Sequence, residues 1–157
     1  MIRSFKYHIA PAHSIENDIQ DDCQYIIIST GSRYDMLNEK KNVLVLHFAD
    51  TELDVRLDSI HLNNVEMIDA FLQKCIFDDV FISCDEGQSR SPAVTAGLLK
   101  CSGNDDSYIW KSNEYRPNVL VYRTVLEYYS SLPNVANELK RIKGDTVEGY
   151  REFRKNE

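Results

Sequence analysis

Three short runs of branched, apolar residues constrain the fold of this chain most. They are Gln24 to Ser29 (QYIIIS), Asn42 to Phe48 (NVLVLHF) and Asp79 to Ser83 (DVFIS). Their apolar residues follow one another instead of alternating with polar ones, which indicates strands that are covered on both faces. Such strands are typical of parallel sheets, because crossover helices cover the faces of these sheets. We therefore predict an α/β fold with a mainly parallel central sheet.

The segments between and after these runs carry helical patterns. In Asn63 to Ile76, for example, Val65, Ile68 and Leu72 recur at helical spacing. The predicted helices are Asn63 to Ile76, Gln88 to Lys100, Asn118 to Tyr129, Pro133 to Lys143 and, docked at the C-terminal end, Thr146 to Arg154. The polar stretch Ser102 to Arg116 predicts a long loop with a short helical piece.

Length and charge limit the classes of function. With 157 residues, we expect residues 1–157 to form a single domain. A net charge of -7 argues against nucleic acids and anionic membranes as partners, since both require a basic surface. The N-terminal Met1 to Ala10 has no apolar core of a secretory signal, and no run approaches the length of a membrane span. The four cysteines form no C-x-x-C pair, so we expect free thiols and a cytoplasmic protein.

The segment Asp79 to Leu99 (DVFISCDEGQSRSPAVTAGLL) is the most informative chemically. A predicted strand ends at Ser83, a short loop begins at Cys84, and a helix follows. A loop that enters a helix presents unpaired backbone N–H groups and the positive end of the helix dipole to an anion. The same field stabilises a thiolate at Cys84, the nucleophilic form of cysteine. Arg90 offers a planar fork for two phosphate oxygens, and the Ser91 hydroxyl can reach back to the sulfur.

This pattern, C-x-x-G-x-S-R-S-P, resembles the signature loop of the cysteine-dependent protein tyrosine phosphatase superfamily, and most closely its dual-specificity branch with small bacterial and phage members. Weaker likeness extends over Val43 to Asp50 and Arg116 to Tyr129. The resemblance implies a four- or five-stranded sheet flanked by helices, a cysteinyl-phosphate intermediate, and neither metal nor cofactor. The phosphate-binding residues it implies are Asp85, Glu86, Gly87, Gln88, Ser89 and Arg90.

The chain departs from the family pattern at two places. Ser83 stands where the family usually has a histidine that helps to activate the thiol, which predicts slower chemistry. Asp85 and Glu86 place carboxylates in the loop, where they would repel phosphate if they pointed inward. We expect both side chains to point outward while the backbone N–H groups point inward.

A phosphatase of this type also needs a general acid for the leaving oxygen. We expect the strand Asn42 to Phe48 to neighbour Asp79 to Ser83, so that both strands end at the same edge. Asp50 follows the first of these strands, 34 residues before Cys84, and is the preferred candidate. Asp54 is the main competitor, and Glu52 and Asp58 are others. Asn118 is interpreted as a helix cap that, by resemblance, also braces the signature loop.

The leading hypothesis is a phosphomonoester hydrolase in which Cys84 attacks phosphorus, Asp50 protonates the leaving group and Ser91 assists. A catalytically weak phosphate-binding module is the first alternative, and a sulfurtransferase the second. Because candidate cations near the loop are few, the expected substrate is a phosphorylated protein or a small aryl phosphate. Phosphotyrosine, phosphoserine and non-protein phosphates all remain open.

Overall fold

In the computed structural model, which describes residues 2–157, four strands form one sheet in the order β1-β4-β2-β3. The strands are β1 (Lys6–Pro11), β2 (Gln24–Ser29), β3 (Val43–His47) and β4 (Asp79–Cys84). Every pair of neighbouring strands is parallel. The predicted α/β fold with a parallel sheet and flanking helices is therefore confirmed.

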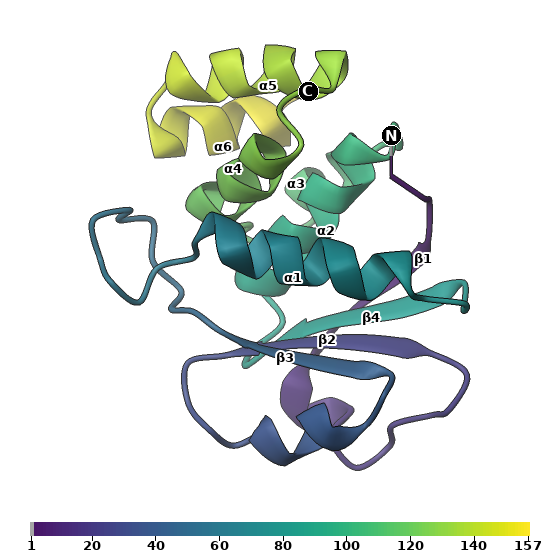
Figure 1. Ribbon diagram of the computed structural model, residues 1–157. Coiled ribbons are helices and arrows are strands. Elements are labelled where there is room, and N and C mark those ends of the chain that lie inside the picture. The colour runs from purple at the N-terminus through teal and green to yellow at the C-terminus, as the bar shows by residue number, and fades with distance from the viewer. Residues whose placement is uncertain (1) are drawn as a thin grey trace.

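The α-helices all lie on one side of the sheet (Figure 1). They are α1 (Leu62–Gln73), α2 (Arg90–Cys101), α3 (Ser107–Lys111), α4 (Val119–Tyr128), α5 (Pro133–Lys143) and α6 (Val147–Lys155). Two short 3-10 helices, η1 (Ala12–Ser14) and η2 (Asp35–Glu39), lie on the other side with their connecting segments (Figure 1). Both faces are thus covered, as the continuous apolar runs predicted, but one face is covered without an α-helix. All six residues of the inner strand β2 are accordingly buried.

The strand order corrects one expectation. We expected the strand that precedes Asp50 to lie beside the strand that leads to Cys84, but β2 separates β3 from β4. Ile28 of β2 lies opposite Cys84, and Ser29 lies opposite His47 of β3. The carboxyl ends of the three strands therefore still meet at one edge, so the loops after β3 and β4 open onto the same side of the molecule.

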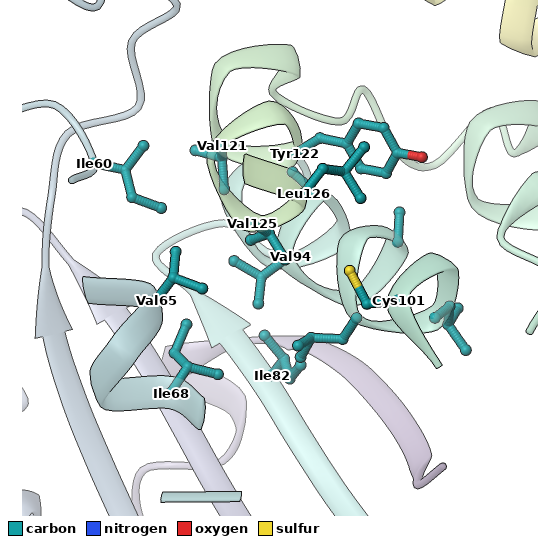
Figure 2. Close-up of a cluster of buried hydrophobic side chains, with 14 of the residues drawn as sticks. Ile60, Val65, Ile68, Ile82, Val94, Cys101, Val121, Tyr122, Val125 and Leu126 are labelled. Atoms are coloured by element: carbon teal, nitrogen blue, oxygen red, sulfur yellow. The ribbon is translucent and has the colours of Figure 1, made fainter. Parts of the chain in front are cut away.

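The main hydrophobic core lies between the sheet and helices α1, α2 and α4 (Figure 2). Ile82 of β4, Val65 and Ile68 of α1, and Val94 of α2 are fully buried there. At Gly97, an added Cβ would come within 2.7 Å of the Val125 side chain, so the missing side chain lets α2 pack closely against α4. This packing fixes α2, whose N-terminus forms part of the candidate site.

The structure adds a strand and fixes the C-terminal helix. The edge strand β1 was not predicted, since its residues (KYHIAP) are half-buried or exposed and contain charged and polar side chains. Helix α6 is docked as predicted, because Tyr150 and Arg154 are buried and Arg154 Nη1 donates to the hydroxyls of Tyr122 (3.2 Å) and Tyr150 (3.0 Å). Across residues 2–157, no helix has both the length and the apolar character that a membrane span requires.

Candidate active site

Cys84 lies at the floor of an open cavity of about 440 Å³ at the carboxyl edge of the sheet. It is the last residue of β4 and is 2% exposed. The cavity is lined by Asp50, Cys84, Asp85, Glu86, Gln88, Ser89, Arg90 and Arg116. The structure therefore brings the predicted nucleophile, the arginine predicted to bind phosphate and the preferred candidate for the acid to a single cavity.

The sulfur of Cys84 is held by the first turn of α2. Ser91 Oγ lies 3.2 Å from Sγ, and the Ser91 backbone N–H donates to Sγ at 3.4 Å. Ser89 occupies the N-cap position, yet its side chain does not cap the helix and donates to Asp50 instead. The positive end of α2 is thus directed at the sulfur.

The backbone of the loop leaves its N–H groups free for an anion. The carbonyl groups of Gln88 and Ser89 accept hydrogen bonds from the backbone N–H groups of Arg116 (2.8 Å) and Asn118 (3.1 Å). Within residues 2–157, the N–H groups of residues 85–89 have no backbone or side-chain acceptor. A loop with engaged carbonyls and free N–H groups is suited to surround an oxyanion.

Gly87 gives the loop its curvature. Its φ angle is +71°, in the left-handed region that residues with a Cβ rarely adopt. An added Cβ would lie 2.7 Å from Pro11 N and 2.9 Å from the carbonyl carbon of Ala10, both backbone atoms of β1. The loop can therefore follow this path only if the position carries no side chain.

We predict that Gly87→Ala lowers the free energy of unfolding by about 2 kcal/mol, because the left-handed conformation and the clash with β1 both oppose it. Chemical denaturation of the two proteins measures the difference. Gly31→Ala is the matched control, since its added Cβ meets no atom within 4 Å. If Gly87→Ala proved as stable as the control, this account of the loop would be contradicted.

Arg90 is held at the cavity by contacts with the segments that follow β2, β3 and β4. Its side chain is 7% exposed, and Nη1 donates to the Phe48 carbonyl oxygen at 3.0 Å. Nη2 donates to Asp85 Oδ2 at 3.0 Å, and Ser29 Oγ donates to the other oxygen of Asp85 at 2.9 Å. Asp85 thus differs from the expectation that its side chain points outward, because Arg90 and Ser29 both bind it. Glu86 is exposed, as expected.

Asp50 is the acidic residue of its loop that lies at the cavity. Its Oδ1 accepts hydrogen bonds from Ser89 Oγ and Asn118 Nδ2, both at 2.8 Å. The competing carboxylates are bound elsewhere and do not line the cavity with Cys84. Glu52 accepts from Val119 N and Arg151, Asp54 pairs with Arg123, and Asp58 pairs with Arg56. Geometry therefore favours Asp50 over Asp54.

Asn118 makes contacts with both α4 and the loops at the cavity. Its Oδ1 accepts from Val121 N at 3.0 Å, which caps α4. Its Nδ2 donates to Asp50 Oδ1 and to the Thr51 carbonyl oxygen, while its backbone N–H donates to Ser89. One residue thereby ties the signature loop to the loop that carries Asp50.

Ser83, which stands where the phosphatase family that the loop resembles usually has a histidine, is fully buried within β4. Its Oγ has no hydrogen-bond partner in the part of the chain that the structure describes. Ser83 pairs with Ala10 of β1 and Ile27 of β2 in the sheet, one residue before Cys84. Its hydroxyl therefore makes no contact through which it could assist the sulfur.

We predict that Ser83→Ala raises the free energy of unfolding by about 1 kcal/mol, because burial of an unpaired hydroxyl is unfavourable. Thermal or chemical denaturation measures this change. A loss of stability would show that the hydroxyl has a partner in solution, and the role of this side chain would then need a new explanation.

Sequence reasoning missed the supports of Arg90. These supports lie at the carboxyl ends of two strands: Ser29 ends β2, Thr30 follows it, and Phe48 follows β3. No sequence motif marks them. Only their position at the carboxyl ends of predicted buried strands could have indicated that they lie near the site. Among residues 2–157, no group of three or more His, Cys, Asp or Glu side chains is placed to hold a metal ion.

In comparisons with known proteins, no family model, no curated protein and no solved structure matches the chain.

Proposed function

We propose that this protein is a phosphomonoester hydrolase of the cysteine-dependent protein tyrosine or dual-specificity phosphatase type. The observation that carries the proposal is the joint position of Cys84, Arg90 and Asp50 around one cavity at the N-terminus of α2. A buried thiol alone would not support it. A nucleophile, an anion-binding loop and a carboxylate at the same cavity together provide what phosphoryl transfer through cysteine requires.

In the proposed reaction, the loop N–H groups and Arg90 bind the three non-bridging oxygens of the phosphate. Cys84 Sγ attacks phosphorus, the bond between phosphorus and the ester oxygen breaks, and Asp50 donates its proton to that oxygen. A water molecule then gives a proton to Asp50 and attacks the cysteinyl phosphate, which releases inorganic phosphate and the thiolate. The Ser91 hydroxyl stabilises the departing thiolate from its position 3.2 Å away. Stabilisation of the equatorial oxygens supplies most of the acceleration.

The contacts of the site favour an enzyme over a phosphate-binding module. A binding module needs neither a carboxylate fixed beside the loop nor a hydroxyl beside the sulfur. In this chain, Asp50 is positioned by two donors from separate elements, Ser89 and Asn118. The same carboxylate favours phosphoester hydrolysis over sulfur transfer, which needs no proton donor for an alcohol leaving group.

The proposed substrate is a phosphorylated protein or a small aryl phosphate, met in the cytoplasm. In addition to Arg90, the cavity wall contains one further cation, Arg116, whose guanidinium pairs with Glu148. The wall also contains the carboxylates of Asp50, Asp85 and Glu86. A site with this balance of charge is poorly suited to nucleic acids or to polyphosphorylated lipids.

A substrate panel tests the proposal. The purified chain is incubated with p-nitrophenyl phosphate, phosphotyrosine and phosphoserine peptides, and, separately, with thiosulfate and cyanide. We expect release of inorganic phosphate from the esters and no formation of thiocyanate. Thiocyanate without phosphate would establish the sulfurtransferase instead, and binding of phosphate without turnover of any ester would establish the binding module.

A further inference from the structure

The guanidinium of Arg90 has donors left over after its contacts within the protein. Of the five N–H groups of an arginine, two are on Nη1, two on Nη2 and one on Nε. Nη1 donates to the Phe48 carbonyl oxygen at 3.0 Å and, over a longer 3.4 Å, to Thr30 Oγ1. Nη2 donates to Asp85 Oδ2 at 3.0 Å. One N–H of Nη2 and the buried Nε, which has no partner within residues 2–157, remain.

The two nitrogens that carry these donors, Nε and Nη2, lie on the same edge of the planar group. Nε–H and the outer N–H of Nη2 run parallel, so together they can bind two oxygens of a phosphate side by side. A guanidinium that rotated would offer a different edge or bend away from the cavity. Its orientation is therefore as important for phosphate binding as its charge.

We propose that Asp85 is the positioning residue that holds this edge of Arg90 toward the substrate phosphate. The inference rests on the proposed function. Asp85 can do so because it is itself fixed: Ser29 Oγ, at the end of β2, donates to Oδ1 while Arg90 donates to Oδ2. A continuous chain of hydrogen bonds thus connects the sheet, through the loop carboxylate, to the phosphate-binding arginine.

The charge of Asp85 does not contradict this role. Burial alone would raise the pKa of Asp85, but hydrogen bonds from Ser29 and Arg90 and the positive charge of Arg90 outweigh it and lower the pKa. Asp85 is therefore ionised at neutral pH, and its charge is compensated by a guanidinium 3.0 Å away. Loss of Asp85 would remove one negative charge from the cavity and would also leave Nη2 without its acceptor.

Glu86 makes these two effects separable. It is the next residue of the loop, lines the same cavity and carries the same charge, but its side chain has no hydrogen bond or ion pair within residues 2–157. Electrostatic repulsion alone predicts that Asp85→Ala and Glu86→Ala both bind phosphate more tightly. If Asp85 positions Arg90, the two variants should differ: Asp85→Ala should bind phosphate more weakly, and Glu86→Ala should bind it more tightly.

The test is calorimetric titration of inorganic phosphate into the full chain, with kcat/KM for p-nitrophenyl phosphate as a second readout. We expect Asp85→Ala to bind phosphate about tenfold more weakly and to lose kcat/KM in parallel. Asp85→Asn should restore both, because its amide oxygen can accept from Nη2 and its amide N–H can reach Ser29. Glu86→Ala should bind phosphate more tightly than the unmodified protein.

Tighter binding by Asp85→Ala, or an Asp85→Asn variant that behaves like Asp85→Ala, would overturn the inference while leaving the proposed function intact. Absence of phosphate binding by the unmodified protein would overturn the proposed function itself. If Asp85→Ala does not fold, Ser29→Ala takes its place, since it removes a contact that fixes Asp85 and should weaken phosphate binding in the same direction.

Discussion

We expect Cys84→Ser to lower the turnover of every phosphate ester by about 10⁴-fold or more, while the protein still binds phosphate or vanadate. A serine hydroxyl is a far weaker nucleophile than a thiolate at the end of a helix dipole, and its conjugate is a poorer leaving group in the second step. The groups proposed to bind the oxyanion are the loop N–H groups and Arg90, which the substitution leaves in place. Initial rates with p-nitrophenyl phosphate, and titration with vanadate, measure the two properties.

Cys23→Ser is the matched control for this variant. Cys23 is a free, half-buried thiol that lies just before β2, at the opposite end of the sheet from the cavity. The same atomic change there should leave the rate unaltered. Full activity of Cys84→Ser would eliminate the phosphatase mechanism, whereas loss of both activity and vanadate binding would mean that the loop had collapsed.

We expect Asp50→Asn to lower kcat/KM by about 100- to 10,000-fold for alkyl phosphates such as phosphoserine peptides, whose leaving oxygen must receive a proton. Since kcat/KM reports the steps up to formation of the cysteinyl phosphate, the loss for p-nitrophenyl phosphate should be much smaller, because p-nitrophenolate leaves without a proton. Asparagine can still accept from Ser89 and Asn118, so the loop geometry is retained.

Asp54→Asn is the control, as Asp54 lies on the same loop but pairs with Arg123. We expect it to keep both the rate and the dependence on the leaving group. If Asp54→Asn shows the losses and Asp50→Asn does not, the acid is Asp54. If neither does, the general acid lies outside this loop, and the case for a weak phosphate-binding module becomes stronger.

The sequence predicted those parts of the fold whose side chains are buried together. The runs that became β2, β3 and β4 are continuous and apolar because the sheet is covered on both faces. Strand β1 was not predicted, because an edge strand that contains Lys6 and His8 has no continuous apolar run. The strand order was wrong in one pairing, since the order depends on long-range contacts that no local pattern encodes.

In the candidate site, too, local arrangements could be predicted from the sequence and long-range contacts could not. Cys84, Arg90 and Ser91 belong to one loop and helix start, so the chemistry of neighbouring residues was sufficient to predict their arrangement. The orientation of Asp85 was not predictable, because it depends on Ser29, 56 residues earlier. The link from Asn118 to Asp50 spans 68 residues and required the observed packing of α4 against the loop.

The most direct test of the central claim is to trap the intermediate on Cys84. In Asp50→Asn with p-nitrophenyl phosphate, the first step should remain fast, while hydrolysis of the cysteinyl phosphate, which also needs Asp50, should become slow. Rapid mixing should then show a burst of one p-nitrophenol per protein molecule, and peptide mass spectrometry after acid quenching should find one phosphoryl group on Cys84. A burst-free time course with no phosphoryl group on Cys84, in a variant that still turns over, would contradict the account.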